Sequence, residues 1–167
     1  MNNKMISPLL FVGVMAGSAA AAEPTKAADG SICMRVVIPA SESDIRSEID
    51  TATEANSLVG SAKLISAEPD GNCERLTYQT PGLISSLTYV ARRCPTADGW
   101  EETLVSSDDF ADNQSSWRLR EVEGGTEIDY RVRVRLNLPV GQSIVDAKIA
   151  QSIKRAIEQL EERVSGK

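Results

Sequence analysis

The sequence contains no histidine and only three cysteines, Cys33, Cys73 and Cys94, which limits the chemistry that its side chains can perform. Histidine is the usual general base, the commonest metal ligand and the side chain whose charge changes near neutral pH. A cysteine in this chain also lacks an imidazole that would activate it as a nucleophile. The sequence therefore predicts no catalytic residue, no metal site and no cofactor.

Three acidic residues, Asp108, Asp109 and Asp112, are spaced closely enough to suggest calcium ligands. They lack the glycine and the terminal glutamate of an EF-hand loop, so a polar turn is the favoured interpretation. The sequence also has no glycine-rich phosphate loop, zinc-ligand spacing or G-x-S-x-G nucleophile motif.

Five arginines recur on alternate positions of two predicted strands and form a basic stripe on one face of a sheet. They are Arg118, Arg120, Arg131, Arg133 and Arg135. Such a stripe would suit a carboxylate-bearing partner protein. The favoured alternative is a solvated face on which the arginines pair with nearby acids, because surface ion pairs are common and weak.

Two of the cysteines lie at the outer ends of a predicted hairpin that turns at Pro81-Gly82. Its strands are Cys73–Thr80 and Ile84–Arg93, so Cys73 and Cys94 meet near one edge. In an oxidising compartment we expect them to form a disulfide. Cys33 is then free, or pairs with another chain.

The first 22 residues have the three parts of a secretory signal peptide. Lys4 gives a positively charged start, Met5–Gly17 is apolar, and small residues lead to Ala22. The apolar stretch is shorter than the roughly 20 residues that a membrane-spanning helix needs. We expect cleavage near Ala22, a periplasmic protein and no stable membrane anchor.

The rest of the chain is predicted to be a flexible leader at 23–31 and one domain at 32–167, which is a usual domain size. The formal net charge of the sequence is −6. An acidic protein gains nothing from the electrostatics of nucleic acid or anionic lipid, so both partners are disfavoured.

The predicted domain begins with a strand at Cys33–Pro39 and a short helix that Ser41 caps. Asp44, three residues after Ser41, completes the helix-start pattern, and Ile45, Ile49 and Ala52 give the helix an apolar side. Further strands are predicted at Ala62–Ser66, Trp100–Ser106 and Ser116–Val122, with an acidic link at Ser107–Asn113 before the last of these.

A two-residue turn at Gly124-Gly125 joins two strands of alternating polarity and predicts a hairpin with a primed turn. This register pairs Trp117 with Val132 and Leu119 with Tyr130 on one face, and Arg120 with Asp129 on the other.

A long amphipathic helix is predicted at Ser143–Val164, with apolar residues at three- and four-residue steps. An antiparallel sheet with one apolar face needs a cover, and this helix is the only predicted element long enough to supply one. The fold class is therefore α+β: a strand, a short helix, six more strands and a long C-terminal helix.

At Val36–Ser41, Tyr78–Gly82 and Trp117–Tyr130, and in the closing helix, the chain resembles the START-related helix-grip superfamily, in its polyketide cyclase/dehydrase and lipid-transport branch. The resemblance covers about Cys33–Val164. It implies a seven-stranded curved antiparallel sheet that grips the long C-terminal helix, with an apolar ligand between them. Members of that family bind lipids, sterols, quinones or polyketides.

The resemblance implies that apolar and tyrosine side chains of the inner sheet face and the helix line a ligand cavity. The expected lining residues are Leu76, Tyr78, Leu87, Tyr89, Trp117, Leu119, Tyr130, Val132, Ile149 and Ile153. The alternative is an ordinary packed core, because protein interiors normally close to high density.

Three functions remain open from the sequence. The first is a non-catalytic periplasmic carrier or sensor of a hydrophobic small molecule. The second is a protein-interaction module with a filled core that uses the outer sheet face or Cys33. The third is a cyclase/dehydrase-type enzyme, which would need Tyr, Glu or Asp to move protons because histidine is absent.

Overall fold

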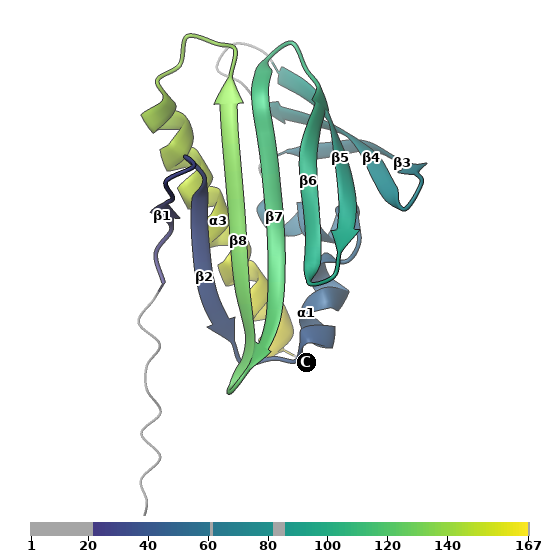
Figure 1. The fold of residues 1–167 in the computed structure, drawn as a ribbon, viewed down its shortest axis with the longest axis vertical. Coiled ribbons are helices and arrows are strands. Elements are labelled where there is room, and N and C mark those ends of the chain that lie inside the picture. The colour runs from purple at the N-terminus through teal and green to yellow at the C-terminus, as the bar shows by residue number, and fades with distance from the viewer. Residues whose placement is uncertain (1–21, 61, 82–85, 167) are drawn as a thin grey trace, which may run out of the picture.

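The computed structural model describes residues 22–60, 62–81 and 86–166, which form one open antiparallel sheet and three helices (Figure 1). The strands lie in the order β1-β2-β8-β7-β6-β5-β4-β3. Their bounds are β1 Thr25–Lys26, β2 Ile32–Ile38, β3 Lys63–Asp70, β4 Cys73–Pro81, β5 Ser86–Thr96, β6 Gly99–Ser106, β7 Phe110–Val122 and β8 Gly125–Leu136. The helices are α1 Glu42–Ile49, α2 Ala52–Val59 and α3 Gln142–Ser165.

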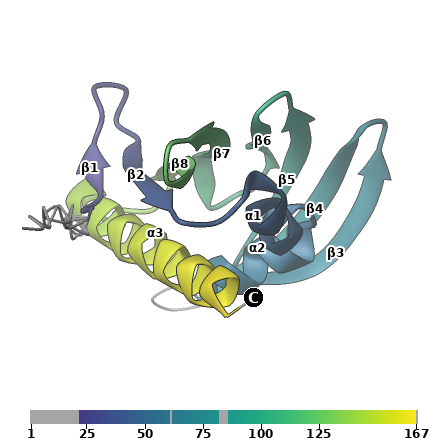
Figure 2. The ribbon, with the colours of Figure 1, turned by 90° about the horizontal axis from the view of Figure 1, so that it is seen from below.

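The sheet curves around the helices, which all lie on its concave side (Figure 2). Helix α3 contacts β2 and β8 as well as α1 and α2. This arrangement confirms the predicted α+β class, with a curved antiparallel sheet that grips a long C-terminal helix. The described sheet has eight strands instead of the expected seven.

The additional strand, β1, lies inside the segment expected to be a flexible leader. Thr25 pairs with Cys33 and Lys26 pairs with Ile32 of β2. The Lys26 ammonium also lies 2.5 Å from a carboxylate oxygen of Asp146 on α3, so this part of the leader is tied to both sheet and helix. The predicted signal peptide falls almost entirely on residues 1–21, outside the described part of the chain. Among the described residues, no helix is long and apolar enough to cross a membrane.

The segment after β2 forms two helices, where the sequence predicted one. Ser41 caps α1 as expected: its hydroxyl accepts a hydrogen bond from the Asp44 backbone N–H at 3.1 Å. Thr51 then starts α2 with a capping box, in which its side chain and that of Glu54 each accept from the other's backbone N–H. Ala52, expected on the first helix, therefore belongs to α2, because the second cap restarts the helix.

The β7–β8 hairpin forms, but the predicted register is wrong by two residues. The turn consists of Glu123 and Gly124, and Gly125 pairs with Val122 inside the ladder. Trp117 therefore lies opposite Tyr130 and Leu119 opposite Ile128. A shift of two residues keeps every side chain on its predicted face, because the side-chain repeat of a strand is two.

The physical reason for this register is the close approach of another segment to Gly125. A Cβ on Gly125 would lie 2.0 Å from the backbone oxygen of Ile38, at the end of β2. The next residue, Thr126, is fully buried and donates its hydroxyl to the backbone oxygen of Ala40 at 2.9 Å. Gly125, with φ of +145°, is therefore needed in the strand for close packing, and Gly124, with φ of +91°, supplies the positive φ of the two-residue turn.

Strand β7 begins six residues earlier than predicted and includes part of the expected acidic link. The remaining turn is polar, as expected: the Ser107 hydroxyl accepts from the backbone N–H groups of Asp109 and Phe110. Asp112 lies in the strand and pairs with Arg133 at 2.7 Å. Within the described ranges, no group of three potential ligands could hold a metal ion.

Buried side chains form two separate clusters on the concave side of the sheet. The main core lies between α3 and the strands β2, β7 and β8, with contributions from α1, α2 and β6. Its buried members are Ile32, Met34, Ile38, Ile45, Ile49, Leu58, Trp100, Trp117, Leu119, Ile128, Tyr130, Ile153, Ala156, Ile157, Leu160 and Val164. The smaller hairpin cluster, built on β4 and β5, consists of Ala52, Leu76, Tyr78 and Ala91, with Ala62, Leu64 and Tyr89 against them.

Candidate ligand-binding site

The residues expected to line a cavity all lie on the concave side, but they are divided between the two clusters. Trp117, Leu119, Tyr130, Val132, Ile149 and Ile153 belong to or pack against the main core. Leu76, Tyr78 and Tyr89 belong to or pack against the hairpin cluster, and Leu87 is buried on β5. Tyr78 lies directly opposite Tyr89 in the ladder, with ring centroids 5.1 Å apart.

A carboxylate that the sequence analysis did not single out, Glu102 on β6, lies on the same concave face. Its neighbours across the ladder are Arg93 of β5 and Ser115 of β7. The Tyr78 hydroxyl donates a hydrogen bond to its Oε2 at 3.2 Å. Glu102 lies two residues after the buried Trp100, so strand alternation from Trp100 would have predicted that it points inward.

Three tyrosines surround this carboxylate. Burial raises the pKa of Tyr78, Tyr89 and Tyr130, and the negative charge of Glu102 raises each pKa further. Burial also raises the pKa of Glu102 itself, although the Tyr78 hydrogen bond and the charge of Arg93 act in the opposite direction. The site therefore favours neutral phenols and a protonated carboxyl more strongly than water does.

Arg93 brings a buried positive charge to this face and was also missed in the sequence. Only 5% of its surface is exposed, and its Nη2 donates to the backbone oxygen of Ile49 at 2.5 Å. The guanidinium lies over the Trp100 ring, 4.7 Å from its centroid, which is a cation–π arrangement. Burial lowers the pKa of Arg93, and nearby acids, first among them Glu74, oppose that shift.

The aromatic rings continue in both directions from the polar residues. Trp100 stacks with Trp117 at a centroid distance of 6.4 Å, and Trp117 stacks on Tyr130 at 3.9 Å. On the other side, the ring centroids of Tyr89 and Phe110 are 4.8 Å apart. The concave face thus presents an acid, a guanidinium and phenols between two apolar regions, an arrangement typical of sites for amphiphilic small molecules.

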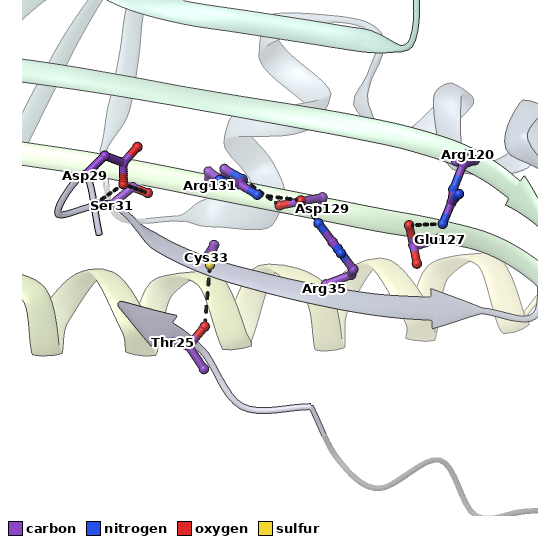
Figure 3. Close-up of polar contacts among 9 residues, drawn as sticks. All are labelled: Thr25, Asp29, Ser31, Cys33, Arg35, Arg120, Glu127, Asp129 and Arg131. Carbon is purple, nitrogen blue, oxygen red and sulfur yellow. Dashed lines mark hydrogen bonds and ion pairs between the residues drawn. The ribbon is translucent and has the colours of Figure 1, made fainter. Parts of the chain in front are cut away.

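The predicted disulfide between Cys73 and Cys94 is present, with Cα atoms 4.3 Å apart. It joins the outer ends of the β4–β5 hairpin, as the sequence indicated. Cys33 is a free, partly buried cysteine on β2, and its sulfur lies 3.5 Å from the Thr25 hydroxyl of β1 (Figure 3).

On the convex face, the arginine stripe is interleaved with acids (Figure 3). Asp129 pairs with both Arg35 and Arg131, at 2.7 and 3.0 Å. Arg120 pairs with Glu127 at 2.9 Å, so the predicted Arg120–Asp129 pair is wrong, a consequence of the shifted register. Arg118 pairs with Asp98 and Glu101, and Arg133 pairs with Asp112. These contacts favour the solvated-face interpretation of the stripe.

Surface hollows in the described part of the chain include one that lies away from the concave face and one that borders Glu102. One, of about 430 Å³, lies beside the β7–β8 turn and is lined by residues such as Pro39 and Gly124. The other, of about 200 Å³, lies at the strands β6, β7 and β8, and its lining includes Glu102 and Val132 as well as Asp29 and Arg131. Of the predicted lining residues, only Val132 borders either hollow.

The chain matches no protein-family model and no curated protein sequence. Solved structures do resemble it. The protein TTHA0849 from Thermus thermophilus has a TM-score of 0.66 at 14% identity, over 81% of this chain and 97% of that one. A START superfamily protein from Mycobacterium smegmatis has a TM-score of 0.64 at 17% identity, over 81% and 97% of the two chains.

A third similar structure is the Zhui aromatase/cyclase of Streptomyces sp. R1128. Its TM-score is 0.54 at 9% identity, over 80% of this chain and 87% of that one. At these identities the likeness concerns the fold alone. The fold is therefore the START-related helix-grip fold that the sequence resembled, and the similar structures include an aromatase/cyclase.

Proposed function

We propose that this protein is an exported, non-catalytic carrier or sensor of a hydrophobic small molecule, which it holds between the concave sheet face and the helices. The single observation that carries the proposal is the polar set of Glu102, Arg93 and Tyr78 on an otherwise apolar, aromatic face. A packed core is stable without such groups, whereas a ligand with one polar end needs them for orientation.

Binding requires that the helices move away from the sheet, because the expected lining residues are mostly buried side chains in contact with one another. The apolar part of the ligand would then replace side-chain contacts of α3 or of the α1–α2 pair. The free energy of binding would come from removing its apolar surface from water.

Export is supported by the sequence of residues 1–22 and agrees with the Cys73–Cys94 disulfide, since disulfides persist mainly in oxidising compartments. Cell fractionation and intact mass test this part directly. We expect the protein in the periplasmic fraction, with the intact mass of a chain that begins near Glu23. A cytoplasmic protein that retains residues 1–22 would contradict export without bearing on ligand binding.

The binding proposal is tested by native mass spectrometry of protein purified gently from its own compartment, followed by solvent extraction. Additional mass that is released as a lipid, sterol or quinone supports the carrier and identifies its cargo. A chain that carries no additional mass, even after incubation with a lipid extract, would contradict the carrier. This result would favour an interaction module with a filled core.

A cyclase/dehydrase-type enzyme is the second candidate, and one observation favours it. Burial raises the pKa of Glu102, and its carboxyl accepts a hydrogen bond from Tyr78, so Glu102 could act as a general acid toward a bound molecule. Conversion of a bound molecule, abolished by Glu102→Gln, would support this candidate. A ligand recovered unchanged after prolonged incubation would support the carrier.

A further inference from the structure

Two buried hydrogen-bond donors on the concave face have no hydrogen-bond acceptor among the described residues. They are Nη1 of Arg93 and the indole Nε1 of Trp100. Both side chains are more than nine-tenths buried, with 5% and 6% of their surfaces exposed. A buried donor without an acceptor is costly and rare in native proteins, and it often marks a position that a ligand or water completes.

The two donors belong to side chains in direct contact. The Arg93 guanidinium lies 4.7 Å from the centroid of the Trp100 ring. Its other terminal nitrogen is already bonded to the Ile49 backbone oxygen. The nearest charged oxygen to Nη1, Oε2 of Glu74, is 3.7 Å away, beyond hydrogen-bond distance. Arg93 is thus fixed in place with the N–H groups of Nη1 still unused.

The charges around Arg93 restrict the acceptor that fits. Glu74, Glu102 and Asp50 lie near enough to the guanidinium for their charges to raise its pKa. These acids already offset its positive charge, so an added carboxylate would be repelled by Glu74 and Asp50 and would compete with Glu102 for the guanidinium. A neutral oxygen, such as a ketone, ester or quinone carbonyl, accepts hydrogen bonds without adding charge.

We propose that Arg93 and Trp100 form the polar end of the ligand site and receive a neutral carbonyl oxygen of an otherwise apolar ligand. The inference rests on the proposed carrier function and adds the chemical class of the cargo. Trp100 leads directly to the stacked rings of Trp117 and Tyr130, so the apolar part of the ligand would extend into the main core.

Isothermal titration calorimetry with two probes of equal chain length, 2-decanone and decanoate, tests the proposal. The wild-type protein is expected to bind the ketone at least tenfold more tightly than the carboxylate. Trp100→Phe removes the N–H and keeps a ring, and should weaken ketone binding about three- to tenfold, the usual range for one neutral hydrogen bond. Arg93→Lys should weaken it too, but that variant loses packing as well.

Trp117→Phe is the matched control, because it removes an indole from the same aromatic stack. It is expected to affect ketone and carboxylate binding equally. In the absence of probe, Trp100→Phe should be at least as stable to urea as Trp117→Phe, since it removes an unsatisfied buried donor.

Equal losses of ketone affinity in the two tryptophan variants, or tighter binding of decanoate than of 2-decanone, would overturn the inference and leave the hydrophobic carrier standing. Binding of neither probe, together with a bare chain after incubation with lipid extract, would overturn both.

Discussion

At the scale of single residues, Glu102 is a carboxyl group whose pKa is set mainly by burial. Its carboxyl lies between Arg93 and Tyr78, yet burial outweighs both of these favourable contacts and raises its pKa. A group with such a pKa binds its proton more tightly in the folded state than in the unfolded state. The folded protein therefore loses stability as pH rises from the ordinary glutamate value, about 4.3, through the raised value.

Glu102→Gln imitates the protonated carboxyl and should remove this loss. We expect the stability of the variant relative to wild type to increase as pH rises from about 4 to 7. Urea unfolding at several pH values gives the comparison. Glu101→Gln, on the opposite face and paired with Arg118, is the control and should give no such increase. A difference between Glu102→Gln and wild type that does not change with pH would contradict the assignment.

At the scale of elements, the β7–β8 turn shows two neighbouring glycines with different roles. Gly124 provides a backbone conformation with φ of +91°, and a Cβ added there would have nothing within 4 Å. Gly125, with φ of +145°, lies against the backbone of Ile38 and Pro39. The conformation of the turn requires glycine at position 124. The close packing of β8 against the end of β2 requires glycine at position 125.

Alanine substitutions should separate these roles. Gly124→Ala is expected to destabilise the protein by about 1–2 kcal/mol, from backbone conformation alone. Gly125→Ala should cost roughly 3 kcal/mol or more, because it also displaces backbone atoms. Chemical denaturation measures both. Equal losses would show that the close approach to Ile38 is not rigid.

The β1 segment is a second element whose role lies in its contacts. Lys26 pairs with Asp146 and Glu23 pairs with Lys154, so two ion pairs connect the segment to α3. Thr25, between them, lies against the sulfur of Cys33. The segment therefore both bridges the sheet edge to the helix and covers the free thiol.

The double variant Lys26→Ala/Lys154→Ala should loosen this segment and expose Cys33. We expect its reaction with a thiol reagent such as DTNB to become several-fold faster, with little change in global stability, because exposed ion pairs contribute little. Lys148→Ala, an exposed lysine of α3, is the control and should react at the wild-type rate. An unchanged rate in the double variant would mean that β-strand pairing alone holds the segment.

At the scale of the whole molecule, one curved sheet supports two clusters that differ in their attachment to the helices. The main core is packed against α3 over most of its length. The hairpin cluster includes Ala52 of α2 and is built on β4 and β5, the two strands that the Cys73–Cys94 disulfide joins. The bridge stabilises the part of the sheet that the long helix does not cover.

Removal of the bridge should therefore weaken the molecule measurably. The variant Cys73→Ala/Cys94→Ala opens a covalent loop with a sequence separation of 21 residues. We expect it to lower the free energy of unfolding by about 3 kcal/mol, as judged from urea unfolding of oxidised protein. Wild-type protein kept in reducing agent is the control and should show a similar loss. No difference between oxidised and reduced wild type would contradict a stabilising role.

Features that depend on local pattern and chain order could be predicted from the amino-acid sequence. The alternation through Tyr130 and Trp117 assigned these residues to the buried face, and the stripe through Ile153 and Ile157 predicted the long helix. The turn region between Cys73 and Cys94 indicated the disulfide. These elements indicated the α+β class, because period and length together decide which face of an element is buried, and the resemblance to the START-related superfamily added the helix-grip fold.

Features that depend on contacts between distant segments could be found only in the folded chain. The register of Gly125 follows from its contact with Ile38, and no local turn rule contains that contact. Glu102 and Arg93 become neighbours only when β5 and β6 pair. Only the folded chain places the Arg93 guanidinium over the Trp100 ring. A buried charge acquires its pKa and its partners from the folded surroundings, so the polar end of the proposed site could not be found in the sequence pattern alone.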